Sequence, residues 1–125
     1  MPREADRPSP LRILLVSDDD EFVAHVLDSA FDRGVEVARA GSGDDLEIAA
    51  FRHGANVVVV DADAAPRRSS RAATAFASEH PGVTVVLAAT AGTEAAAVGE
   101  VALVEREPAE SLLRDVDRIR CGYDR

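Results

Sequence analysis

The stretch "NVVVVDAD", residues 56–63, decides the fold of this 125-residue chain. Its four consecutive valines, Val57–Val60, form a β-branched run with no polar face. Such a run is typical of a strand buried on both sides of a parallel sheet. Two carboxylates, Asp61 and Asp63, follow where the strand ends. They either mark a site or belong to a plain acidic loop.

Apolar runs alternate with helical patterns on both sides of this stretch. The predicted strands span 12–17, 35–40, 56–61, 83–90 and 101–105. The predicted helices span 20–33, 41–54, 67–82, 92–100 (a turn or two) and 108–119. Asp20 is expected to cap the first helix, and Gly34 to end it. This alternation predicts an α/β fold: a doubly wound, five-stranded parallel sheet between two helical layers. We expect one domain over 11–121, with a disordered leader at 1–10 and a tail at 122–125.

Composition limits the classes of partner. The formal net charge is −9, and all 14 basic residues are arginines. An acidic chain is a poor ligand for nucleic acid or an anionic membrane, so a basic protein surface or a divalent cation is favoured. No signal-peptide core or membrane-length apolar run is present, and Cys121 is the single cysteine, so we expect a cytoplasmic protein. The histidines His25, His53 and His80 show no metal-ligand spacing.

Carboxylates follow the first strand as well as the third. The segment "SDDDE", residues 17–21, includes Asp18 and Asp19. Because parallel strands bind ligands at their carboxyl ends, Asp18 and Asp61 should share a pocket if the two strands are neighbours. Such oxygens suit Mg²⁺. The alternative for Asp19, Asp20 and Glu21 is that they only cap and charge a helix start.

The order and spacing of these segments resemble the receiver domain of two-component response regulators, the CheY-like family. The resemblance rests on "ILLVSDDDEF" (13–22), "GSGDDLEIAAFRHGANVVVVD" (41–61), "VTVVLAATA" (83–91) and a closing Glu-Pro (107–108), and covers residues 11–120. It implies a flavodoxin-like fold and a signalling role without enzyme activity. It also implies that Asp61 is the phospho-acceptor and that Asp18 and Asp61 bind Mg²⁺.

Several positions depart from the pattern that the resemblance implies. Receivers carry two acids after the first strand, but Ser17 stands at the first of these positions. They carry Thr or Ser after the fourth strand, where this chain offers Ala89 or, with a shift of one residue, Thr90. The aromatic residue that receivers place in the fifth strand is absent.

The largest departure follows the fifth strand, where receivers carry a lysine. The position of that lysine corresponds to Glu107 if it is located by the proline that follows, or to Glu105 if it is located by the end of the strand. Only a shift of one residue would place Arg106 there, and Arg67 or Arg68 could otherwise supply a cation. At an effective dielectric near 20, unit charges about 4 Å apart interact by about 4 kcal/mol. A glutamate in place of the lysine should therefore impair phosphorylation.

Three hypotheses follow. The first is a degenerate pseudo-receiver that binds a signalling protein, such as a histidine kinase or another regulator, independently of phosphate. The second is a working receiver phosphorylated on Asp61 with Mg²⁺. The third, more remote, is a phosphatase like the haloacid dehalogenases, with Asp61 as nucleophile and Asp63 as general acid. Alanine-rich helices could also pair two copies into a homodimer, although packing on the sheet is the commoner reason for alanine.

Overall fold

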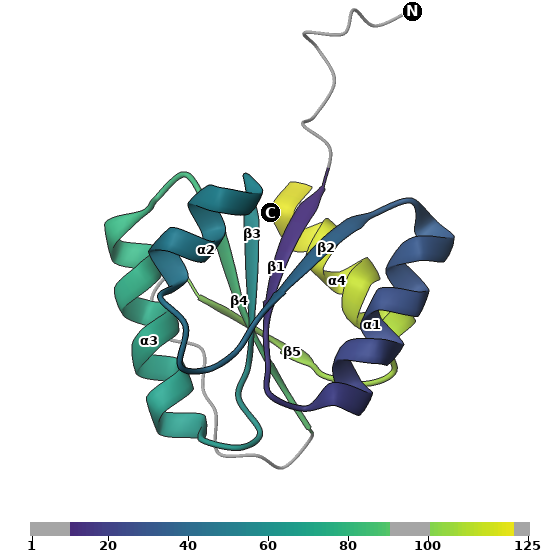
Figure 1. Ribbon diagram of the computed structural model, residues 1–125, viewed down its shortest axis with the longest axis horizontal. Helices are drawn as coiled ribbons and strands as arrows, with labels where there is room; N and C mark the ends of the chain where they lie inside the picture. The colour runs from purple at the N-terminus through teal and green to yellow at the C-terminus, as the bar shows by residue number, and fades with distance from the viewer. Residues whose placement is uncertain (1–10, 91–100, 122–125) are drawn as a thin grey trace, which may run out of the picture.

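A five-stranded parallel sheet forms the centre of the molecule, as a computed structural model that describes residues 11–90 and 101–121 shows (Figure 1). The elements in that part are β1 (Arg12–Val16), α1 (Asp20–Arg33), β2 (Glu36–Ala40), α2 (Leu46–His53), β3 (Val57–Asp61), α3 (Pro66–Glu79), β4 (Thr84–Ala89), β5 (Ala102–Glu105) and α4 (Ala109–Cys121). The strand order is β2-β1-β3-β4-β5. The predicted doubly wound α/β fold is therefore confirmed. The short helix predicted for 92–100, the leader and the tail lie outside the described residues.

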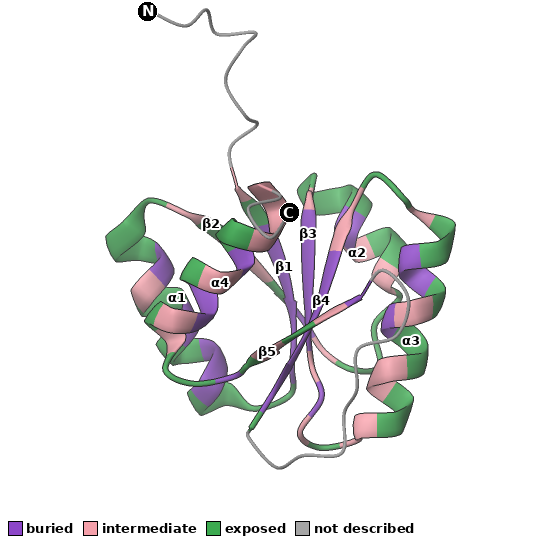
Figure 2. Ribbon diagram, turned by 180° about the vertical axis from the view of Figure 1, so that it is seen from behind, coloured by how far each residue is buried: buried purple, intermediate pink, exposed green. Residues whose placement is uncertain are grey.

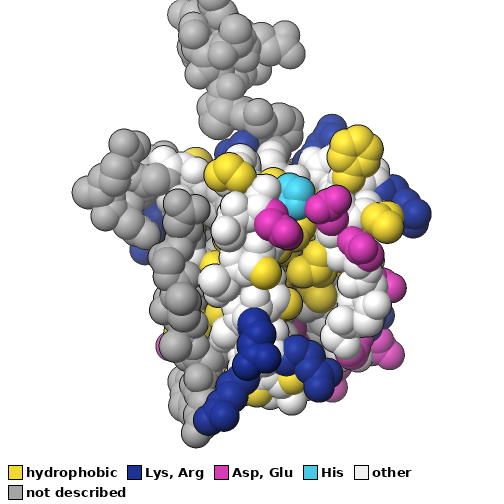
Figure 3. Space-filling model, turned by 90° about the vertical axis from the view of Figure 1, so that its left-hand side faces the viewer, with side chains coloured by type: hydrophobic (Ala, Val, Ile, Leu, Met, Phe, Trp, Pro, Cys, Tyr) yellow, Lys and Arg dark blue, Asp and Glu magenta, His cyan; other side chains and the backbone are white. Residues whose placement is uncertain are grey.

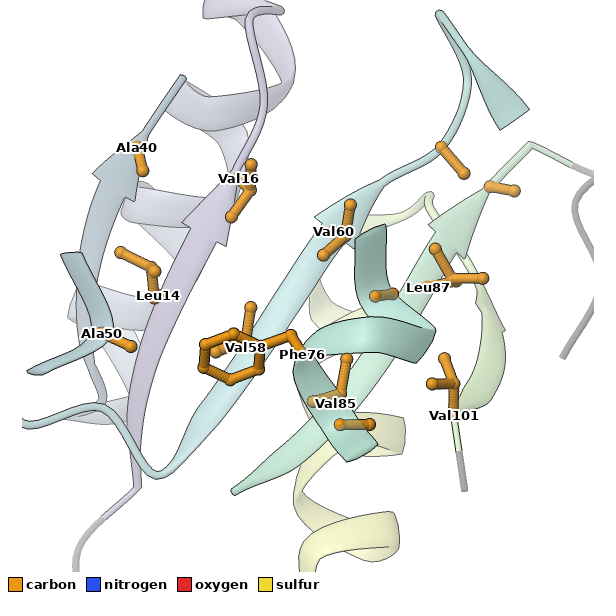
Figure 4. Close-up of a cluster of buried hydrophobic side chains, with 14 residues drawn as sticks. Leu14, Val16, Ala40, Ala50, Val58, Val60, Phe76, Val85, Leu87 and Val101 are labelled. Atoms are coloured by element: carbon orange, nitrogen blue, oxygen red, sulfur yellow. The ribbon is translucent and has the colours of Figure 1, made fainter. Parts of the chain in front are cut away.

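The central strands β1, β3 and β4 are buried on both faces, as the apolar runs predicted (Figure 2). On one face, side chains of β1, β3 and β4 pack with α2 and α3; this cluster includes Leu14, Val58, Leu87 and Phe76 (Figure 4). On the other face, the alternate residues of the same strands pack with α1 and α4. Because successive strand residues point to opposite faces, a continuous valine run supplies both layers.

Helix α1 begins one residue earlier than expected. Asp19, not Asp20, is the N-cap: its carboxylate accepts hydrogen bonds from the backbone N–H groups of Glu21 and Phe22. Either aspartate could cap by residue type, so only the backbone decides between them. Gly34 ends the helix in the left-handed region (φ 68°), as predicted.

No helix among the residues described, 11–90 and 101–121, combines the length and the apolar composition that crossing a membrane requires.

Candidate functional site

The carboxyl ends of β1 and β3 meet, as the sequence predicted. The two strands are paired in parallel, with Val16 opposite Val60. The next residue of each strand therefore lies at the same edge of the sheet. Ser17 is buried, and its Oγ donates a hydrogen bond to Oδ2 of Asp61 at 2.6 Å.

The end of β5 brings a cation to this edge. The backbone N–H of Arg106 donates to the carbonyl oxygen of Ala89 at 2.9 Å, which extends the pairing of β4 and β5 by one residue. Val104 packs toward α1 and α4, whereas Glu105 is exposed. Because strand side chains alternate, Arg106 lies on the same side as Val104 and turns inward.

Arg106 makes a two-point ion pair with Asp61. Its Nε donates to Oδ1 at 3.0 Å and its Nη2 to Oδ2 at 3.2 Å, and the two side chains are only 8% and 7% exposed. Nη2 also donates to the carboxylate of Asp19, and Nε lies 3.6 Å from Oδ2 of Asp63. The guanidinium sits over the ring of Phe22, 4.1 Å from its centroid. Arginine, with its planar fork of donors, suits such a site better than lysine does.

The charges of this cluster stabilise one another. Burial alone would lower the pKa of Arg106, but its hydrogen bonds to Asp61 and Asp19, with the nearby charges of Asp61 and Asp63, outweigh burial and raise it. The hydrogen bond from Arg106, together with that from the Phe22 N–H, lowers the pKa of Asp19. Arg106 is thus held as a permanent cation among carboxylates.

The prediction that a glutamate faces Asp61 is wrong. Glu105 points to solvent, and the side chain of Glu107 is 64% exposed and accepts a hydrogen bond from Nη1 of Arg106 at 3.1 Å. The prediction relied on the following proline, whereas the β4 pairing places Arg106 inward. Two signals in the sequence pointed to this residue: its position two residues after the apolar Val104, and the absence of any lysine.

Hydrogen bonds occupy both oxygens of Asp61. Oδ1 accepts from Nε of Arg106 and from the N–H of Asp63, and Oδ2 accepts from Ser17 Oγ and Nη2 of Arg106. A carboxylate offers about four lone-pair sites, so these donors fill it. To bind Mg²⁺, a carboxylate oxygen must direct a free lone pair at the ion. With Arg106 in this position, the residues do not fit that ion.

Asp18 belongs to the same cleft but has its own partner. Ser42, in the loop after β2, donates to both Asp18 oxygens, from its N–H at 2.9 Å and from its hydroxyl. These hydrogen bonds lower the pKa of Asp18. Asp18 and Asp61 both line one cleft of about 810 Å³ between the loop before α2 and the start of α3. The two predicted site residues thus line the same cleft, and each carboxylate is hydrogen-bonded to its own protein donors.

The two residues considered after β4 take different positions. Ala89 is the last residue of β4 and is buried. Thr90 is exposed, and both its N–H and its hydroxyl donate to the carboxylate of Asp63, not to Asp61. Of the arginines in the first turn of α3, Arg68 lines the cleft. Phe22 is a site residue that the sequence prediction missed. Asp63 had been considered as the general acid of a phosphatase, Asp19 as either a site residue or a helix cap, and Arg106 as the cation if the register shifted by one residue.

Comparison with known proteins supports the fold. No family model and no curated protein sequence matches the chain. Among solved structures, the chain is similar to an atypical orphan response regulator with a phosphorylation-independent regulatory mechanism (14% identity, TM-score 0.65, 90% of this chain and 97% of that one). It is also similar to the chemotaxis response regulator CheY4 of Vibrio cholerae (20%, 0.68, 89% and 99%). A third neighbour is the pseudo-receiver domain of the CikA protein (16%, 0.60, 88% and 96%).

The chain therefore has the CheY-like, flavodoxin-type fold of response regulator receiver domains. Its structural neighbours include both a chemotaxis response regulator and a pseudo-receiver. The residues of the pocket, and not the fold, therefore distinguish a phosphorylatable receiver from a degenerate one.

Proposed function

We propose that this chain is a cytoplasmic, receiver-like signalling domain that acts by binding another signalling protein and does not depend on phosphorylation of Asp61. The observation that carries the proposal is the buried two-point ion pair between Arg106 and Asp61. For a receiver to be phosphorylated, this carboxylate must be available as a nucleophile. Here both of its oxygens already accept hydrogen bonds from protein donors.

The arginine supplies a positive charge where the resemblance to receivers implies Mg²⁺ and a lysine. In phosphoryl transfer the protein contributes mainly charge placement and positioning. An arginine that already pairs with four carboxylates, those of Asp61, Asp19, Asp63 and Glu107, leaves neither a metal position nor a cation for an incoming phosphoryl group. The domain would then hold one conformation, which a partner such as a histidine kinase or another regulator recognises.

The alternative is phosphorylation of Asp61 with Mg²⁺ bound by Asp18 and Asp61. It is favoured by one observation: both carboxylates line a cleft large enough for a small phosphodonor. It requires Arg106 to leave Asp61 and Ser42 to leave Asp18. The phosphatase hypothesis is weaker, because a general acid must donate a proton, and both oxygens of Asp63 accept hydrogen bonds from Thr90.

Intact-mass measurement after incubation with acetyl phosphate and Mg²⁺ tests the proposal. We expect no phosphoryl adduct on the wild-type protein. An adduct that forms on the wild type and is lost in Asp61→Asn would overturn the proposal in favour of the alternative. An Arg106→Gln variant serves as the matched comparison, since its Asp61 is released from the ion pair.

A further inference from the structure

A second cluster of ligating side chains lies away from the Asp61 cleft. Glu47, in the first turn of α2, and Glu79 and His80, at the end of α3, each offer one ligand atom, and these atoms lie within 4.8 Å of one another. Figure 3 shows a histidine with acidic side chains around it on the face formed by these helices. The sequence did not predict this cluster, because Glu47 is far along the chain from the other two residues.

The geometry of the histidine is suited to metal binding. Its Nε2 lies 3.1 Å from Oε2 of Glu47. Its ring packs against the ring of Phe76, with centroids 4.5 Å apart, and Phe76 is itself buried in the core. The core therefore fixes the ring plane and points Nε2 toward the carboxylates. Zinc bonds to imidazole nitrogen and carboxylate oxygen are about 2.0–2.2 Å long, so tetrahedral ligand atoms are separated by about 3.4 Å.

We propose that Glu47, Glu79 and His80 form a binding site for a first-row divalent transition ion such as Zn²⁺. The imidazole nitrogen selects for such an ion over Mg²⁺, which prefers oxygen ligands alone. Three protein ligands leave one coordination position for water. The ion differs in kind and in place from the Mg²⁺ that the receiver resemblance implies, and the inference is independent of the proposed function.

Binding there would have a consequence for the cleft. Helix α2 has eight residues and one buried side chain, Ala50, so it is weakly anchored. Leu46, next to Glu47, lines the Asp61 cleft. An ion that joins the first turn of α2 to the end of α3 would hold this wall of the cleft in place, and so order the surface offered to a partner.

Isothermal titration calorimetry with ZnCl₂ tests the proposal. All samples carry Cys121→Ser, because a thiolate is a competing zinc ligand. We expect one zinc ion per chain, with affinity at least tenfold lower in His80→Ala and in Glu47→Gln. His53→Ala, which removes an exposed histidine from the last turn of α2, is the matched control and should bind as the parent does.

Two further measurements decide the location and the effect. Asp61→Asn should leave zinc affinity unchanged, and zinc should slow amide hydrogen exchange in α2 of the parent but not of His80→Ala. The proposal is overturned if the parent binds no zinc at millimolar concentration, if His80→Ala binds it equally well, or if Asp61→Asn abolishes binding.

Discussion

The guanidinium of Arg106 and the carboxylate of Asp61 face each other through two hydrogen bonds, of 3.0 and 3.2 Å, at the buried end of two strands that are not neighbours in the sheet. β3 carries Asp61 and β5 precedes Arg106, with β4 between them. The long arginine side chain reaches past the end of β4, so Arg106 joins the carboxyl ends of β3, β4 and β5. The function proposed above depends on that contact, and so should the stability of this edge of the sheet.

Replacing Arg106 with glutamine should cost about 3–5 kcal/mol of unfolding free energy, since it leaves the buried Asp61 charge without its partner. Urea denaturation measures the change. Arg12→Gln is the matched control: it removes an exposed pair with Glu36, and such pairs are worth at most about 1 kcal/mol. Equal losses in the two variants would contradict the assignment of a buried pair.

Phe22 should couple energetically to Arg106, because its ring lies under the guanidinium. In a double-mutant cycle of Phe22→Leu with Arg106→Gln, we expect a coupling energy of about 0.5–2 kcal/mol. Leucine keeps the site apolar, so the cycle reports the cation–ring contact. Phe76→Leu, on the opposite face of the sheet, should show no coupling with Arg106→Gln. Absence of coupling at Phe22 would mean that the ring serves only the core.

Ser17 and Ser29 give a second matched pair. Ser17 Oγ donates to Asp61 and accepts from the N–H of Asp19, so Ser17→Ala should cost about 1 kcal/mol or more. Ser29 Oγ is buried without a hydrogen-bond partner among the described residues, so Ser29→Ala should be neutral or stabilising. Thermal or urea unfolding compares the two. The reverse order would show that Ser17 does not stabilise the site.

Acid should weaken the cluster. The pKa of Asp19 is held below its ordinary value of 3.8, first by the hydrogen bond from Arg106. A carboxylate with a lowered pKa in the folded state contributes stability that is present above the unfolded pKa and is lost as the pH falls through the folded one. Asp19→Asn keeps a good N-cap but has no such titration. Its unfolding free energy should therefore fall less steeply than that of the wild type between about pH 5 and about pH 2. Parallel curves would contradict this role of Asp19.

The sequence predicted the sheet well because burial and strand pairing leave a local pattern. Val57–Val60 specify a strand buried on both faces, and Asp61 at its end is at the site, as expected. The cation was harder to find. Whether Glu105, Arg106 or Glu107 turns inward depends on the hydrogen bond from Arg106 to Ala89, a contact between distant residues. The choice between Asp19 and Asp20 as cap likewise depends on one backbone angle pair and not on residue type.

The most direct test of the Arg106–Asp61 ion pair is NMR observation of the Arg106 Nε–Hε resonance, assigned by comparison with Arg106→Gln, during titration with Mg²⁺ and then beryllofluoride as a phosphoryl mimic. If Arg106 stays paired with Asp61 throughout the titration, the resonance remains protected from solvent exchange and does not shift. A shift or loss of protection that is saturable with Mg²⁺ or beryllofluoride, and absent in Asp61→Asn, would show that Asp61 takes a metal or phosphoryl ligand and would contradict a permanent Arg106–Asp61 pair.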